Sequence, residues 1–199
     1  MPDAAWIAKL LVTDTGPLIT LAVADSLACL LYPAVPVHIP DAVLYEATVK
    51  SGSLGAENIV LWMQEHPDAV RPIVTQTYVN FQTLRSHNPL HRERDLGERA
   101  ALEAIRYGIP LASEERAVLL TEDDRAATVL VLPDDRQRLI TMTTFDFLTG
   151  LELAGRIQSA EAIYRLAADA GRNAARIAVL QAQHERAQQA VDHLLRQKS

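Results

Sequence analysis

The chain has 199 residues, a formal net charge of −6 and 49% apolar residues, a composition that excludes disordered and fibrous proteins. The acidic balance also excludes a protein whose whole surface binds nucleic acid, so any such contact must be local. One cysteine excludes an internal disulfide, and no signal-peptide pattern or unbroken run of about 20 apolar residues occurs, which predicts a cytoplasmic protein outside the membrane.

Short β-type runs and helix-like segments alternate along the first third of the chain. In order, these segments are a strand at Leu10–Asp14, a helix at Pro17–Ala24, a strand at Val35–Ile39, a helix at Ala42–Lys50, and a helix from Gly55 or Ala56 to His66. Pro17 suits the first position of its helix, and Asp41 suits the N-cap of the next. Pro36 restricts its strand to a sheet edge or places it at the start of the strand.

The same alternation continues after an ambiguous stretch at residues 70–90, where only a short helix at Val79–Arg85 is expected. The later segments are a helix at Glu98–Tyr107, a strand at Ala117–Thr121, a short segment at Arg125–Leu132 and a strand at Arg138–Met142. Strands that alternate with helices are typical of an α/β sandwich with a parallel sheet.

From Phe145 onward the pattern is helical, which divides the chain into a body at residues 1–148 and a C-terminal helical extension at 149–199. Residues 151–199 carry a net charge of +2, whereas the first 150 residues carry −8. An apolar stripe in the extension, formed by Ile177, Leu180, Val191 and Leu194, is typical of a face that packs against the body or a partner helix.

Aspartates follow two of the expected strands. Asp14 ends the first strand, and Asp123 and Asp124 come shortly after the strand at 117–121. Catalytic residues in open parallel sheets gather at the carboxyl ends of the strands, so we expect these side chains to lie in one region. Each aspartate is also consistent with a turn or helix-cap residue.

Two glutamates share the apolar side of their helices. Glu46 lies on the side of Ala42 and Val43, and Glu98 lies on the stripe that leads to Leu102. A carboxylate turned inward requires a cation, an arginine or protonation. An exposed position remains open for Glu46, and a capping box with Asp95 remains open for Glu98.

Four sequence blocks, in their order and spacing, carry a family resemblance. The blocks are LVTDTGPLI at 11–19, VHIPDAVLYE at 37–46, DLGERAAL at 95–102 and LLTEDD at 119–124. Through them the chain resembles the PIN-domain nucleases, and among these the VapC-like toxin ribonucleases of bacterial toxin–antitoxin pairs. The resemblance covers roughly residues 10–148 and implies a PIN-like three-layer sandwich with a central, mostly parallel sheet, followed by the helical extension.

The resemblance also implies roles for individual acids. Matched block by block, the expected catalytic residues are Asp14, Glu46, Glu98 and Asp123. The fourth position stays open between Asp123, which fits the spacing better, and Asp124. The chain departs from the family pattern at residues 109–116, before the last strand of the four blocks, and in the helical extension.

Carboxylates that converge in one cleft repel one another unless a cation neutralises them, and oxygen ligands suit Mg²⁺ or Mn²⁺. We expect Asp14, Glu98, Asp123 and Asp124 as metal ligands, with Glu46 completing the site. A water made more acidic by the metal would then attack an RNA phosphodiester. These expectations define a metal-dependent endoribonuclease.

Positive charge for an RNA substrate is available beside the third and fourth blocks, at Arg92, Arg94, Arg99 and Arg125. The resemblance implies a cognate antitoxin protein as partner and a homodimeric state. Two other functions remain open: a catalytically silent PIN-like module that acts through its C-terminal helices, and another Mg²⁺-dependent phosphoryl hydrolase.

Overall fold

The computed structural model describes residues 7–49, 53–122 and 138–172. Several expectations fall outside these ranges: the positions of Asp123, Asp124 and Arg125, the segment at 125–132, and the stripe at 177–194. Everything below refers to the described residues.

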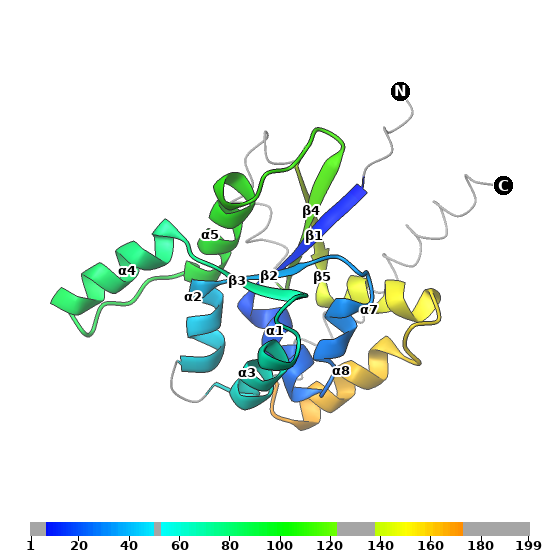
Figure 1. The fold of residues 1–199 in the computed structure, drawn as a ribbon. Helices are drawn as coiled ribbons and strands as arrows, with labels where there is room; N and C mark the ends of the chain where they lie inside the picture. The colour runs from blue at the N-terminus through cyan, green and yellow to red at the C-terminus, as the bar shows by residue number, and fades with distance from the viewer. Residues whose placement is uncertain (1–6, 50–52, 123–137, 173–199) are drawn as a thin grey trace.

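The centre of the molecule is a five-stranded parallel sheet with the order β3-β2-β1-β4-β5 (Figure 1). The strands are β1 (Ile7–Thr13), β2 (Val37–Pro40), β3 (Val70–Ile73), β4 (Glu115–Thr121) and β5 (Leu139–Thr143). The chain runs outward from β1 to β3 and then returns to the other side of β1 as β4. The strand order therefore reverses between β1 and β4, and the carboxyl ends of these two neighbours are where an open sheet forms its crevice.

The two faces of the sheet carry separate apolar cores because side chains alternate along each strand. Leu11 of β1 and Leu120 of β4 belong to one cluster, and Val12 and Leu119 belong to the other. This double burial explains why β1 and β4 read as nearly continuous apolar runs. The predicted α/β sandwich with a parallel sheet is confirmed, and the structure is consistent with the PIN-like three-layer arrangement.

Helices cover both faces of the sheet (Figure 1). The larger core includes residues of α1 (Thr15–Val23), α3 (Ala56–Glu65), α7 (Thr144–Leu153) and α8 (Ala160–Asp169), with the short 3₁₀ segment η1 (Leu27–Leu31). The second core lies beneath α5 (Leu96–Glu103) and its π-helical continuation η3 (Ala104–Gly108). A small cluster joins α5 to α2 (Asp41–Leu44) and α4 (Gln76–His87).

Several local expectations are corrected. Helix α1 begins at Thr15 rather than Pro17, and α4 is twelve residues long rather than a short helix at 79–85. Strand β3 was not expected, since its four residues carry no readable period. Pro36 precedes β2, which is an interior strand, so this proline stands before the strand and not on a sheet edge.

The start of α2 also differs from the expectation. Asp41 is the first residue of the helix and not its N-cap, which is Pro40. The Asp41 carboxylate accepts hydrogen bonds from the Ala42 N–H at 2.9 Å and from the Thr75 N–H and hydroxyl at 3.0 and 2.7 Å. These hydrogen bonds therefore link α2 to the connection between β3 and α4. Beyond Leu44 the helix widens into the π-helical turn η2 (Tyr45–Val49).

The first helices of the C-terminal extension belong to the packed body. Helix α7 begins with a capping box between Thr143 and Asp146 and runs across the expected boundary at residue 148. Helix α8 contacts α1 and α7, and the ring centroids of Tyr164 and Phe145 lie 5.2 Å apart. Within the described ranges, no helix combines the length and the apolar character needed to cross a bilayer.

Candidate active site

The candidate site lies at the carboxyl ends of β1 and β4. Asp14 follows β1 directly, and its N–H donates a 2.9 Å hydrogen bond to the carbonyl oxygen of Leu120 in β4. The side chain of Asp14 faces a cleft of about 340 Å³, yet the residue is only 6% exposed. Its Oδ1 atom is buried and has no hydrogen-bond partner among the described residues. A buried acceptor without a partner costs free energy, so this atom calls for a ligand or a proton.

Glu46 approaches Asp14 from the π-helical turn η2. Its Oε2 atom accepts a 2.9 Å hydrogen bond from the hydroxyl of Thr15, the residue after Asp14. Single π-helical turns inside helices frequently occur at functional sites. Here the turn brings the carboxylate beside the end of β1, so the inward orientation expected for Glu46 is observed.

Gly97 shows how closely these oxygens approach one another. A Cβ atom at this position would lie 2.9 Å from Asp14 Oδ1, from Glu46 Oε2 and from Thr15 Oγ1. Three oxygens therefore surround one point beside the α5 backbone. Glycine is required there for lack of space and not for backbone conformation, because Gly97 is not among the glycines with positive φ.

Glu98 reaches the same cleft from the first turn of α5. The capping box with Asp95 is not formed: Asp95 adopts a left-handed conformation with φ of 53°, and its side chain makes no cap hydrogen bond. The alternative that gave Glu98 a purely local role is therefore wrong. The cleft brings together Asp14, Glu46 and Glu98, whereas Asp123 and Asp124 lie outside the described residues.

Glu122 and Arg172 also line the cleft, and neither was among the expected site residues. The Arg172 guanidinium forms a 2.8 Å ion pair with Glu122 Oε2 and donates to the Gly16 carbonyl at 3.0 Å and to the Thr20 hydroxyl at 3.1 Å. Glu122 also accepts a hydrogen bond from Thr20. The Glu122 side chain is only 3% exposed and that of Arg172 24%, so the pair is largely removed from solvent.

A sequence signal existed for Glu122, which comes directly after β4 and just before the two aspartates that were preferred. No local signal existed for Arg172, which lies 50 residues further along the chain and reaches the site only because α8 packs against α1.

The crowded carboxylates change the acidity of Asp14. Burial is the main cause that raises the pKa of Asp14 to about 8, and the negative charges of Glu98, Glu46 and Glu122 add to the effect, while a backbone hydrogen bond from Thr15 opposes it. Strongly perturbed acids in clefts are candidates for functional sites. Without a cation, Asp14 is therefore largely protonated at neutral pH.

The donor set fits a small hard cation. All the candidate ligands are oxygens, one of them is buried without a hydrogen-bond partner among the described residues, and Asp14 Oδ1 and Glu46 Oε2 lie close together beside Gly97. In the described ranges, no group of three or more His, Cys, Asp or Glu side chains is arranged to hold a metal. Mg²⁺ needs no such cage, because it usually keeps several waters and binds through one or two carboxylates together with substrate phosphates.

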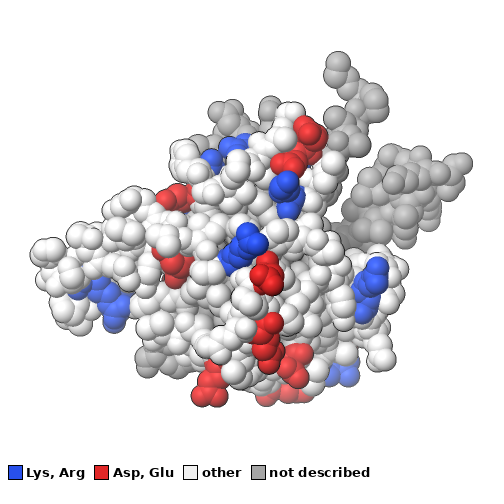
Figure 2. All heavy atoms as spheres, viewed as in Figure 1, with Lys and Arg blue, Asp and Glu red and all other residues white. Residues whose placement is uncertain are grey.

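The expected RNA-binding arginines do not gather in the acidic cleft. Arg92 lines an adjoining hollow, Arg94 is exposed, and Arg99 forms a 2.7 Å ion pair with Glu93; Arg125 lies outside the described residues. In the view of Figure 2, the basic side chains are scattered among acidic and uncharged ones rather than gathered on one face. This face of the described residues therefore offers no broad basic surface for nucleic acid.

Comparisons of the chain with protein-family models, with curated proteins and with solved structures find no match. The function of the cleft must therefore be inferred from its own residues.

Replacing Asp14 by asparagine should change how the stability of the metal-free protein depends on pH. Between pH 3.8 and about 8, the folded state binds a proton at Asp14 that the unfolded state releases, so wild-type stability should fall as the pH rises through this range. Asp14→Asn removes this loss and should be more stable than wild type by about 5 kcal/mol at pH 8, with the difference becoming small near pH 4. Urea unfolding in chelator across this range measures the effect. The exposed Asp68→Asn is the control, and parallel curves for wild type and Asp14→Asn would contradict the account.

A methyl group at Gly97 should disrupt the site. Gly97→Ala inserts a Cβ among three oxygens and should lower the free energy of unfolding by about 1–3 kcal/mol through overpacking. The control is Gly150→Ala in α7, where an added Cβ would meet no described atom within 4 Å, and where alanine should stabilise the helix by about 0.5–1 kcal/mol. Chemical unfolding of both variants measures the two free energies. The same change in unfolding free energy for both would show that an added methyl group at Gly97 does not clash with the three oxygens.

Removing the cation beside Glu122 should destabilise the fold. Arg172→Met leaves a buried carboxylate without its ion-pair partner and should cost about 3 kcal/mol of unfolding free energy. The double variant Arg172→Met/Glu122→Gln should recover most of that loss, because position 122 then carries no charge that needs a partner. The control is Arg165→Met, which removes an exposed pair with Glu161 and should change stability by less than about 0.5 kcal/mol. Additive effects in the double variant would refute the coupling.

Proposed function

We propose that the acidic cleft is the active site of a metal-dependent endoribonuclease, with Mg²⁺ or Mn²⁺ as its cofactor. One observation carries the proposal: the buried Asp14, whose pKa is raised and whose Oδ1 has no hydrogen-bond partner among the described residues, lies close to Glu46 at the place where the strand order reverses. Such an arrangement is costly without a cation, and its position is that of active sites in open α/β sheets.

Asp14 and Glu46 would hold the ion, with Glu98 beside them in the same cleft. A bound Mg²⁺ or Mn²⁺ would supply positive charge that polarises a phosphodiester and makes a water more acidic. The surrounding chain prepares these ligands: the Thr15 hydroxyl orients Glu46, and the close approach of the α5 backbone at Gly97 keeps the oxygens together.

The other residues of the cleft have distinct roles in hydrolysis. Glu98, which lines the cleft, would accept the proton that the attacking water loses as its oxygen bonds to phosphorus and one P–O ester bond breaks. That proton then passes to the leaving oxygen. Arg172 neutralises Glu122, which would lower the negative charge that an approaching phosphate meets at the wall of the cleft.

The resemblance of the four acidic blocks to VapC-like ribonucleases supports a narrower proposal, that the protein is the toxin of a toxin–antitoxin pair. It would then act on RNA in the cytoplasm, form a homodimer and be held inactive by a cognate antitoxin. The charge pattern agrees with such a role, because a few basic residues near one cleft suffice for a substrate whose phosphate meets a metal ion.

A second candidate function is a catalytically silent interaction module on the same fold. The observation that favours it is the Glu122–Arg172 ion pair, since a side-chain cation already compensates one of the acids of the cleft. This function requires no divalent ion, whereas the proposed nuclease requires one.

Cleavage of a labelled single-stranded RNA by the purified full chain separates the two functions. The nuclease should cut RNA with Mg²⁺ or Mn²⁺ and stop in chelator, and Asp14→Asn should lower the rate at least about 100-fold, because it removes the ligand with the unsatisfied oxygen. Asp68→Asn serves as the control and should cut like wild type.

The toxin role has its own readout in the same variants. Expression of the wild-type chain should arrest bacterial growth, and Asp14→Asn should relieve the arrest. Cleavage that persists in chelator or in folded Asp14→Asn would refute the metal-dependent nuclease. No cleavage by folded wild-type protein with either metal would favour the silent module.

A further inference from the structure

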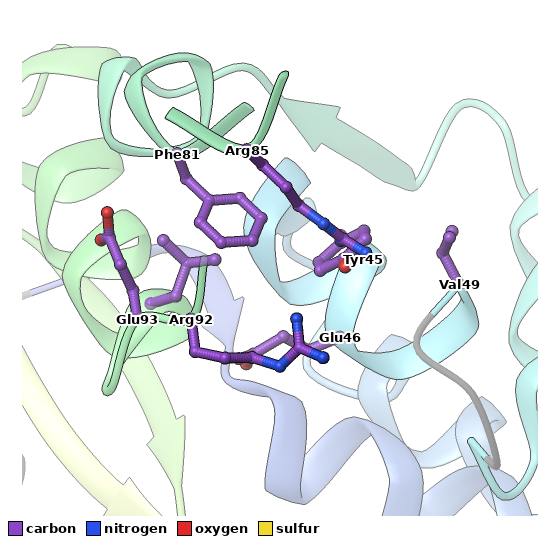
Figure 3. A pocket seen from close by; sticks show the side chains of 8 residues that line it. Tyr45, Glu46, Val49, Phe81, Arg85, Arg92 and Glu93 are labelled. Atoms are coloured by element: carbon purple, nitrogen blue, oxygen red, sulfur yellow. The ribbon is translucent and has the colours of Figure 1, made fainter. Parts of the chain in front are cut away.

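A second hollow, of about 460 Å³, adjoins the acidic cleft, and Glu46 lines both. It lies between α4, the turn η2 and the loop that precedes α5 (Figure 3). Its volume is in the range of sites that hold small organic ligands. An extended ligand that leaves the acidic cleft past Glu46 would therefore enter this hollow next.

The polar wall of the hollow carries two arginines, Arg85 and Arg92, and two glutamates, Glu46 and Glu93. Arg85 reaches in from α4, and Arg92 reaches in from the loop before α5 on the other side (Figure 3). Among the described residues, neither arginine forms an ion pair. The lining carboxylate of Glu93 is already engaged by Arg99 at 2.7 Å and by His91 at 3.1 Å. The two arginines are therefore available to bind an anion, beside the Glu46 carboxylate, which accepts a hydrogen bond from Thr15.

Aromatic rings hold one of these arginines in place. The Arg85 guanidinium carbon lies 5.3 Å from the centroid of the Tyr45 ring and 5.9 Å from that of Phe81, and the two rings are 5.6 Å apart. Cation–π contacts at these distances favour a guanidinium beside the rings, and its planar fork of N–H groups matches the oxygens of a phosphate. The rings thus hold Arg85 at the edge of the hollow.

We propose that Arg85 and Arg92 form a phosphate clamp for single-stranded RNA, which binds the nucleotide next to the one held in the acidic cleft. This inference rests on the proposed nuclease function and adds the path of the substrate. Two features favour a nucleotide: the arginines supply donors for the backbone phosphate, and the apolar part of the lining, with Tyr45 and Leu96, suits a base or ribose. Regular spacing of phosphates along RNA then brings one to the metal and the next to the clamp.

Binding without cleavage tests the clamp directly. In the Asp14→Asn background, fluorescence anisotropy with a short fluorescein-labelled single-stranded RNA measures affinity at several salt concentrations. Arg85→Gln and Arg92→Gln should each weaken binding about fivefold to tenfold and lower the slope of log K against log salt by about 0.7, the value for one lost phosphate contact on a single strand. Arg85→Lys should recover part of the affinity, because it restores the charge without the planar fork.

The matched control is Arg156→Gln, which alters an exposed arginine after α7 and should change affinity less than about twofold. In the otherwise wild-type enzyme with Mg²⁺ or Mn²⁺, the two clamp variants should raise KM by the same factor as they weaken binding and leave kcat nearly unchanged. Unfolding midpoints of all variants confirm that they are folded.

The outcomes separate the two proposals. Wild-type cleavage together with clamp variants that bind RNA like the control would overturn the clamp and leave the nuclease intact. Folded wild-type protein that neither binds nor cuts RNA would overturn both. Arginine-dependent binding of a poly-glutamate peptide, with no arginine-dependent binding of RNA, would make the hollow a protein-binding site and overturn the clamp.

Discussion

Repulsion among carboxylates in a poorly solvated space is the constraint on which the rest of this site depends. Asp14, Glu46, Glu98 and Glu122 line one cleft, and burial of Asp14 makes its negative charge costly. Two contacts partly compensate these negative charges. Arg172 neutralises Glu122, and Thr15 donates a hydrogen bond to Glu46, but Oδ1 of Asp14 has no partner in the described part of the chain. Compensation is therefore incomplete at the one position where a cation would be held.

The same constraint links the fold to the site across long distances in sequence. The parallel sheet places Asp14 and Glu122 at the same edge because β1 and β4 are paired neighbours, with Thr13 opposite Leu120. Helix α8 closes this arrangement from the far end of the described chain: its packing against α1 delivers Arg172 to Glu122 and to the Gly16 carbonyl. Residues after 148 thus take part in both the core and the cleft. An interpretation of the extension as a separate appendage would miss the cation that stabilises the site.

Sequence reasoning succeeded where periodicity and burial act locally and failed where contacts are distant. The apolar runs at β1 and β4 and the inward face of Glu46 were readable, because residues close in sequence share a strand or a helix side. The Asp95–Glu98 spacing also fitted a capping box, but this box does not form. Asp95 has a left-handed backbone, and its side chain makes no cap hydrogen bond. Asp41 likewise does not cap α2 as expected. Its carboxylate instead accepts hydrogen bonds from the N–H and hydroxyl of Thr75, which is distant in sequence.

The sequence by itself determined the α/β class and the parallel sheet, because hydrophobic periodicity is a local pattern. It also predicted that Asp14, Glu46 and Glu98 lie together, from strand ends, helix faces and the four blocks that resemble PIN-domain nucleases, and these three acids do line one cleft. Only the tertiary structure decided that Glu122 joins them, that Arg172 is its counter-charge, and that Gly97 stands where three oxygens meet. It also placed Arg85 over Tyr45, which no spacing along the chain indicates. The physical reason is that such contacts depend on how separate helices pack against the sheet, and charge compensation between residues 50 positions apart leaves no periodic trace in the sequence.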